Sequence, residues 1–115
     1  MASCEFDWWR AASGSRSPAE KEWGKIPPHV RGDFLRLMER WEQEDLQPVG
    51  GDCARLGQWD VFYLRVRRGN NHFRLYFQMR GAYAVVLHVC YKNQQQIDKV
   101  TMRLIEERAK NGERL

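Results

Sequence analysis

Four arginines and a histidine lie within one short stretch, LRVRRGNNHFRLYF, which runs from Leu64 to Phe77. Arginine stays protonated at physiological pH, and its planar guanidinium offers a fork of donors that matches the oxygens of a phosphate. When a ribose 2′-OH attacks the neighbouring phosphate, fixed cations stabilise the charge that grows on the phosphate oxygens. The stretch therefore favours phosphodiester chemistry on RNA.

Arginine is a poor general base, so such a site needs another residue that moves a proton. Histidine titrates closest to neutral pH, and the two candidates are His72 and His88. Lys92 is a third candidate if cationic neighbours lower its pKa. The hydroxyl groups that could serve instead belong to Tyr63, Tyr76 and Tyr91. The residue types alone do not choose among these groups.

Most of these residues also have a plain structural interpretation. A histidine inside an apolar strand, such as His88, is more often a hydrogen-bonded core residue than a catalyst. His72 stands beside the turn GNN, where it either edges the hairpin or contacts a base or phosphate. Arg68 and Arg80 lie at strand ends and are expected to be solvated or to contact the RNA backbone. Arg74, in mid-strand between apolar residues, has a fixed position and is the strongest candidate for function.

The charge distribution along the chain isolates these cations. Residues 61–97 hold six basic residues and no acidic residue, whereas residues 1–60 hold eight basic and eleven acidic residues. A carboxylate-free segment of this length predicts a positive surface, which suits a polyanion such as nucleic acid. The alternative is a solvated sheet face whose charges pair with acids from elsewhere, such as Glu39, Glu42 or Asp45.

The composition predicts one folded domain over residues 1–115. A chain of this length with 43% hydrophobic residues buries a core but is small for two domains. No stretch is apolar enough to span a membrane, and the N-terminus lacks the basic start and apolar run of a secretory signal. Cys4, Cys53 and Cys90 form no pairing pattern, which favours a reducing cytoplasm. The spacing of cysteines and histidines indicates no metal site, and no cofactor is expected.

Hydrophobic periodicity supplies the elements that must position the candidate residues. Residues 4–9 alternate as a strand, with Cys4, Phe6 and Trp8 on one side. Ser17 before Pro18 predicts the start of a short helix, and a second, amphipathic helix is expected from about Pro28. Residues 46–58 are expected to form a loop.

Three strands of an antiparallel meander are predicted after Trp59, with turns at GNN and at Gly81-Ala82. A final helix is expected with Asn93 as its cap and Asn111-Gly112 at its end. Its apolar stripe is predicted to consist of Ile97, Val100, Leu104 and Ile105. The order β-α-α-β-β-β-α predicts an α+β fold with a mainly antiparallel twisted sheet packed on a helical hairpin.

Strand alternation assigns the candidates to a face of this sheet. If the apolar residues of the first two meander strands point into the core, then Arg65, Arg67 and Arg74 project from the opposite face. The third strand leaves two alternatives for the core side, which are Val85-Leu87-Val89-Tyr91 and Val86-His88-Cys90-Lys92. The first is more apolar and is preferred, and it sends His88 and Lys92 to the face of the arginines.

The stretch from Leu64 to the final helix resembles the RelE/ParE superfamily of type II toxins, especially its phage-type HigB-like branch. The shared pattern consists of Leu64-Arg65, the strand Phe73-Arg74-Leu75-Tyr76-Phe77, and a third strand that ends in Tyr91-Lys92. FDWWR, SPAEKEWGKIPP and the second helix follow the same plan more loosely. The chain departs from the pattern at Val61 and Tyr63, where many RelE-like toxins have lysines.

The resemblance implies a RelE-like fold and a metal-independent, ribosome-dependent mRNA endonuclease held inactive by an antitoxin, often a small helix-turn-helix protein. Arg74 takes the position of the family's arginine that stabilises the scissile phosphate. Arg65 and Lys92 take its other recurrent basic positions. No further His or Tyr follows Lys92, so the family's usual C-terminal acid-base residue is either missing or replaced by His88 or Tyr91. The remaining cations are expected to bind RNA, and these are Arg67, Arg68, His72 and Arg80.

Two alternatives stay open from the sequence. A ParE-like toxin would bind DNA gyrase and cleave nothing. A noncatalytic RNA-binding or phage accessory protein would keep the toxin fold and the basic face without the chemistry.

Overall fold

The computed structural model describes residues 4–12, 14, 16–57, 59–92 and 97–114, with the side chains of residues 92, 113 and 114 set aside. The helices are α1 (Pro18–Gly24), α2 (Pro28–Glu42) and α3 (Lys99–Lys110). The strands are β1 (Glu5–Arg10), β2 (Val49–Gly50), β3 (Cys53–Arg55), β4 (Val61–Arg68), β5 (Asn71–Arg80), β6 (Tyr83–Lys92) and β7 (Glu113–Arg114). The predicted α+β fold is confirmed.

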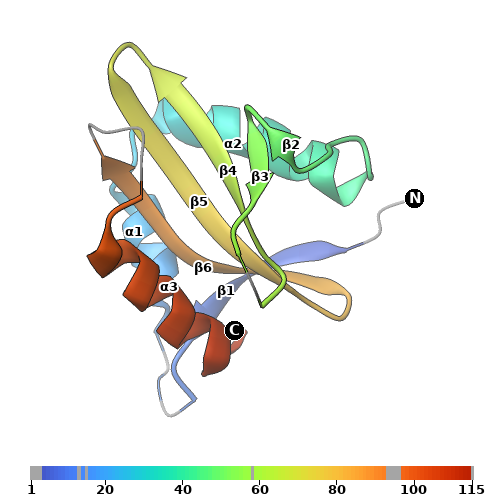
Figure 1. Ribbon diagram of the computed structural model, residues 1–115, viewed down its shortest axis with the longest axis vertical. Helices are drawn as coiled ribbons and strands as arrows, with labels where there is room; N and C mark the ends of the chain where they lie inside the picture. The colour runs from blue at the N-terminus through green and yellow to red at the C-terminus, as the bar shows by residue number, and fades with distance from the viewer. Residues whose placement is uncertain (1–3, 13, 15, 58, 93–96, 115) are drawn as a thin grey trace.

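One twisted sheet organises the chain, with the strand order β2-β3-β4-β5-β6-β1-β7. β4, β5 and β6 form the predicted antiparallel meander, and β1 lies parallel to β6. Figure 1 shows β4 and β5 crossing the middle of the molecule, with α2 behind them and α3 in front near β6. The two faces of the sheet are therefore covered by different helices.

Helices α1 and α2 begin where the sequence predicts. Ser17 caps α1, since its Oγ accepts a hydrogen bond from the Glu20 backbone N–H at 3.2 Å. Proline stands at the start of both helices, where its fixed φ fits and its missing N–H costs nothing. Both helices pack on the same sheet face over one core, whose buried members include Val30, Phe34, Leu64, Leu75 and Phe77.

Helix α3 packs on the other face over a second, smaller core. Ile105 and Ala109 lie against Trp9, Val61 and Leu87, which are also buried. The predicted stripe is wrong at Val100, whose side chain is exposed, and the residues buried on α3 are Thr101, Ile105, Arg108 and Ala109. Asp98 caps the helix by accepting from the Thr101 N–H at 2.7 Å. Asn93, the predicted cap, lies outside the described residues.

A β-bulge in the third meander strand corrects the predicted inward set. The register shifts between the pairs Tyr76↔His88 and Phe77↔Val86, so Leu87 is an extra residue on β6. Beyond the bulge, Val89 and Tyr91 share the α1/α2 face with Leu75 and Phe73, as predicted. Before the bulge the alternation is reversed, and Val86 lies in the α1/α2 core while Val85 lies under α3. The preferred inward set is therefore correct after the bulge, at Val89 and Tyr91, and the alternative set is correct before it, at Val86.

The segment predicted as a loop contains the short strands β2 and β3, which extend the sheet beyond β4. Cys53 of β3 pairs with Leu64, so the core continues to this edge. None of Cys4, Cys53 and Cys90 forms a disulfide bond within the described residues. Within the described residues, no helix is long and apolar enough to cross a membrane.

Gly112, directly after α3, is predicted to be intolerant of a side chain. Its φ is +77°, and a Cβ at this position would overlap Trp9 Nε1 and the Arg10 carbonyl oxygen. Gly112→Ala should lower the free energy of unfolding by about 2 kcal/mol, from backbone strain and steric overlap together. Gly81→Ala is the matched control, because φ is +60° there but nothing lies within 4 Å of the added Cβ. If urea unfolding showed the same loss of unfolding free energy for both variants, the steric overlap at Gly112 would be contradicted.

Candidate functional site

Arg65, Arg67, His72 and Arg74 form a compact block on the sheet face that also carries α3; we call it the cation block. Arg65 lies directly opposite Arg74, and Arg67 lies directly opposite His72, in the β4–β5 register. Directly opposed residues have neighbouring side chains on one face, so the four groups form a two-by-two arrangement. Helix α3 packs over the apolar part of this face, with Val61, Val85 and Leu87, and the block lies toward the β4–β5 turn. Strand alternation had predicted this grouping of the three arginines.

The members of the block differ in exposure. Arg67 is exposed and donates from Nε to the Gly69 carbonyl at 3.1 Å. Arg65 is half-buried, whereas Arg74 is only 1% exposed. Arg65 and Arg67 therefore form the accessible part of the site. Arg74 supplies a charge from within the protein, where a low dielectric strengthens its action on nearby groups.

His72 is 5% exposed and belongs to the block by register and by electrostatics. Its Nδ1 is buried and accepts or donates no hydrogen bond in the part of the chain that the structure describes. Burial, followed by the charges of Arg67, Arg74 and Arg65, lowers the pKa of His72 below its usual value of 6.5. The imidazole is therefore neutral at neutral pH.

His88 lies on the same face, directly opposite Tyr76, and is held by a carboxylate. Its Nδ1 is 3.0 Å from Glu22 Oε1, and its ring stacks with the Tyr76 ring at 6.0 Å between centroids. Only 12% of its side chain is exposed. The structural interpretation of His88, a hydrogen-bonded residue at the edge of the core, therefore has a named partner.

Glu22 and Arg108 close the open edge of β6. The pairing of β1 with β6 ends at Trp8↔Val86, and among the described residues no strand pairs with the next edge groups of β6. Glu22 Oε1 accepts from the Val89 N–H at 3.1 Å, and Arg108 Nη1 donates to the Leu87 carbonyl at 2.7 Å. Arg108 Nη1 is also 3.3 Å from both Glu22 oxygens. This ion pair joins α1, β6 and α3.

The pKa of Glu22 reflects this arrangement. Burial by itself raises the pKa, but the hydrogen bond from His88 and the charges of His88 and Arg108 outweigh that effect. The net result is a pKa below the usual value of 4.5. Glu22 is therefore a carboxylate in the folded protein at neutral pH.

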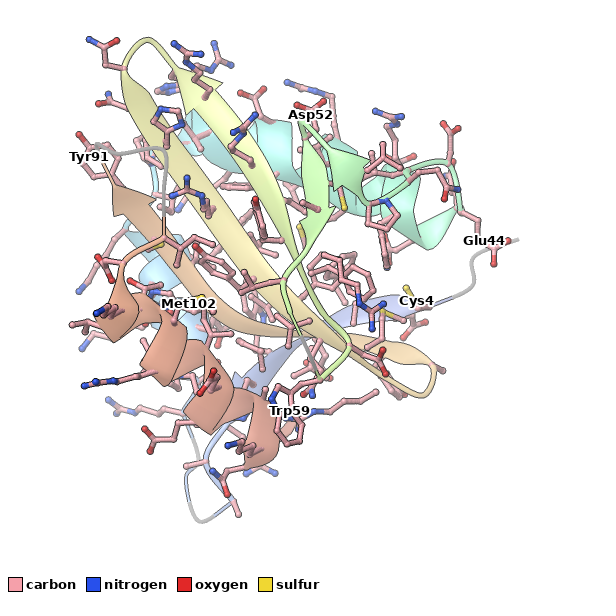
Figure 2. The ribbon with its side chains drawn as sticks, viewed as in Figure 1. Cys4, Glu44, Asp52, Trp59, Tyr91 and Met102 are labelled. Atoms are coloured by element: carbon pink, nitrogen blue, oxygen red, sulfur yellow. The ribbon has the colours of Figure 1, made fainter. Side chains whose placement is uncertain are left out.

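Of the tyrosine candidates, Tyr63 and Tyr76 form the next pair beside the block on the same face, whereas Tyr91 lies on the other face. Tyr91 lies opposite Phe73 on the α1/α2 face, and its hydroxyl donates to Asn71 Oδ1 at 2.9 Å. Figure 2 shows Tyr91 at the far end of β6, away from Met102 on α3. Tyr76 is fully buried, and burial raises its pKa, so its hydroxyl stays protonated. The backbone of Lys92 pairs with that of His72, and its side chain lies outside what the structure describes.

Arg68 and Arg80 have protein partners. Arg68 Nε donates to Asp33 Oδ2 of α2 at 3.0 Å, so the acid that pairs with it is Asp33 and none of the predicted acids. Arg80 donates to carbonyls at the end of α3, including Arg108 at 3.0 Å and Gly112 at 3.2 Å. The structure thus gives Arg80 a capping role for α3 in place of the expected solvated position.

A groove of about 440 Å³ lies between α2 and β4, next to the cation block. Two arginines of α2 and two of β4 line it, together with two aspartates; these residues are Arg36, Arg40, Arg65, Arg67, Asp33 and Asp52. The groove extends the basic surface from the block toward α2. Among the described residues, no group of three or more His, Cys, Asp or Glu side chains gathers as metal ligands would.

Glu22 and Arg108 are functional-site neighbours that no motif in the sequence predicts. Charged residues on helices usually face solvent, and no local pattern marks Glu22 as the partner of a strand that lies 66 residues further on. The spacing of Arg108 is a weak indication of burial, because it stands three residues after the apolar Ile105 and so falls on the buried stripe of α3. The partner of either residue is defined only by the packed helices.

Comparisons with known proteins identify relatives of this chain. The family model described as phage derived protein Gp49-like (DUF891) matches residues 21–110. Two relatives from Mycobacterium tuberculosis, of strains CDC 1551 / Oshkosh and ATCC 25618 / H37Rv, each carry the name probable endoribonuclease HigB1. Each is 32% identical over an alignment of 110 positions, and the alignment covers 91% of this chain and 82% of the relative.

Proposed function

The chain belongs to the phage-derived Gp49-like family of RelE/HigB-type toxins, and on that premise we propose that it is a toxin of a toxin-antitoxin system that cleaves mRNA on the ribosome. The named relatives support endoribonuclease activity. The observation that carries the proposal is the cation block, in which three arginines and a neutral histidine share one face of adjacent strands.

The residues of the block divide the work of phosphodiester cleavage. Arg65 and Arg67 bind phosphate oxygens directly, because their guanidinium groups are accessible. Arg74 stabilises the charge that grows on the scissile phosphate, acting from its buried position between Arg65 and the strand β6. The groove beside β4 guides the neighbouring nucleotides along α2. Lys92 is assigned to the same site through its pairing with His72.

The partners follow from the same proposal. A cognate antitoxin, of which a small helix-turn-helix protein is one expected form, keeps the toxin inactive until it is removed. Ribosome-bound mRNA is the substrate, and the reaction takes place in the cytoplasm without a metal ion or other cofactor.

Induced expression tests this function directly. We expect growth arrest and new mRNA ends within translated regions, because a ribosome-dependent nuclease cuts only mRNA that ribosomes are translating. Blocking translation initiation before induction should remove these ends. Loss of DNA supercoiling without new mRNA ends would instead identify a ParE-like gyrase inhibitor and would refute the proposal.

Noncatalytic RNA binding is a second candidate, favoured by one observation. Arg74 is 1% exposed and does not present its guanidinium to solvent. A binding protein of this kind would hold RNA with strong salt dependence and leave it uncut. Growth without arrest after induction, together with salt-sensitive RNA binding in vitro, would favour this candidate over the nuclease.

A further inference from the structure

We propose that His72 is the proton acceptor of the cleavage reaction and that it takes the proton of the attacking ribose 2′-OH. This inference rests on the proposed ribonuclease function and adds to it the residue that moves the proton. It concerns one histidine of the cation block and leaves the role of the arginines unchanged.

The position of His72 suits this role. It lies two residues before Arg74 on the same face of β5 and directly opposite Arg67 of β4. Same-face neighbours on a strand are about 7 Å apart, which is the span of a phosphate and the adjacent ribose hydroxyl. A phosphate held by Arg65 and Arg67 therefore brings its 2′-OH next to the imidazole.

His72 also differs from the other histidines in its bonding. Within the described residues its ring makes no hydrogen bond, and Nδ1 is the nitrogen that is buried. His88, in contrast, is hydrogen-bonded to Glu22, with 3.0 Å between its Nδ1 and Glu22 Oε1. His29 lies exposed on α2, on the other side of the sheet. An imidazole whose nitrogens make no hydrogen bond can adopt the tautomer that leaves Nε2 without a proton.

The surrounding charges keep this nitrogen ready to accept a proton. The ionisable groups that face His72 are Arg65 and Arg67 of β4 and Arg74 of β5, and the backbone register adds Lys92 and, one pair further along, Cys90 of β6. All but the thiol are cations, and burial and the arginines together lower the pKa of His72. The neutral imidazole is therefore the resting form at neutral pH, as a general base requires.

Water relays a proton in this step and is not consumed. The 2′-O–H bond breaks, its proton goes to Nε2, and the 2′ oxygen forms a bond to phosphorus. The bond between phosphorus and the 5′ oxygen breaks, and that oxygen takes a proton from water. The products are a 2′,3′-cyclic phosphate and a 5′-hydroxyl end. The imidazolium returns its proton to the hydroxide that is left.

The test is single-turnover cleavage of mRNA on preassembled ribosome complexes, at subsaturating protein so that the profile reports the free protein, between about pH 5 and pH 9. We expect the wild-type rate to rise with pH, with an inflection below the usual histidine value of 6.5, and then to level off. His72→Gln should lower the plateau rate by about 100-fold and remove the inflection. His29→Gln is the matched control and should keep both the rate and the profile.

Several outcomes would overturn the inference. A wild-type profile without an inflection below the usual histidine value overturns it before any variant is made. Cleavage by His72→Gln at the wild-type rate overturns it, as does loss of the inflection in His88→Gln. His72→Asn is the second variant, and binding of a 2′-deoxy substrate shows that each variant is folded. If the wild type cuts at no pH, the proposed function itself fails, and the two failures are thus distinct.

Discussion

Arg74→Ala is expected to reduce the rate of mRNA cleavage by about 10² to 10³-fold, the typical cost of losing one preorganised donor or charge at a reacting group. Arg74 lies between Arg65 and Cys90 in the register of the three central strands, and it is 1% exposed. In the proposed reaction, its charge therefore acts from within the protein on a phosphate that Arg65 and Arg67 hold, with little screening by water. Single-turnover cleavage by the purified protein measures the effect.

The burial of Arg74 requires a control that separates charge from volume. Arg74→Met keeps most of the side-chain volume, removes the charge and also removes the like-charge repulsion with the directly opposed Arg65. We expect Arg74→Met to fold and to lose cleavage as Arg74→Ala does. Arg16→Ala, an exposed arginine just before α1, should cleave at the wild-type rate. Full toxicity of Arg74→Met after induction would show that Arg74 is not part of the site.

Glu22→Ala is expected to lower the free energy of unfolding by about 3 to 5 kcal/mol, which corresponds to a fall in Tm of roughly 15 °C. The substitution removes the acceptor of His88, of the Val89 N–H and of Arg108 at once. The Arg108 side chain, which is 11% exposed, is then left as a buried charge without its carboxylate. Urea and thermal unfolding measure the loss. Glu20→Ala, at an exposed position of the same helix, should stay within about 0.5 kcal/mol of the wild type.

The contribution of Glu22 should also depend on pH in a defined direction. Its pKa in the folded protein lies below the usual value of 4.5, so folding favours the carboxylate over the protonated acid. The stability that Glu22 adds relative to Glu22→Gln is therefore present above the unfolded pKa. It is lost as the pH falls through the lower, folded pKa. A difference between the two proteins that grows on acidification would contradict this account.

Local patterns predicted the elements of this chain well. Ser17 followed by proline placed α1, the proline at position 28 placed α2, and the period of two placed β4 and β5 with Arg65, Arg67 and Arg74 on one face. These features depend on neighbouring residues alone, because caps, turns and side-chain alternation are properties of a few consecutive positions. The family resemblance rested on the same short motifs.

The bulge at Leu87 is a feature that local sequence patterns do not predict. A single extra residue reverses the facing of half a strand, and nothing in the alternating apolar run of β6 signals it. The sequence therefore left two alternatives for the inward side of β6. The structure uses one on each side of the bulge, so that Val86 and Val89 both lie in the α1/α2 core while Val85 and Leu87 lie under α3.

From the residues alone, then, came the elements, the shared face of the arginines and the class of chemistry that they favour. Tertiary packing settled how each candidate can act. It buried Arg74, joined Arg80 to the end of α3, and gave His88 a carboxylate partner from α1 while His72 received none in the described part of the chain. The physical reason is that exposure and hydrogen-bond partners depend on segments far apart in the sequence. A histidine receives a hydrogen-bond partner only if the fold brings a suitable side chain beside it.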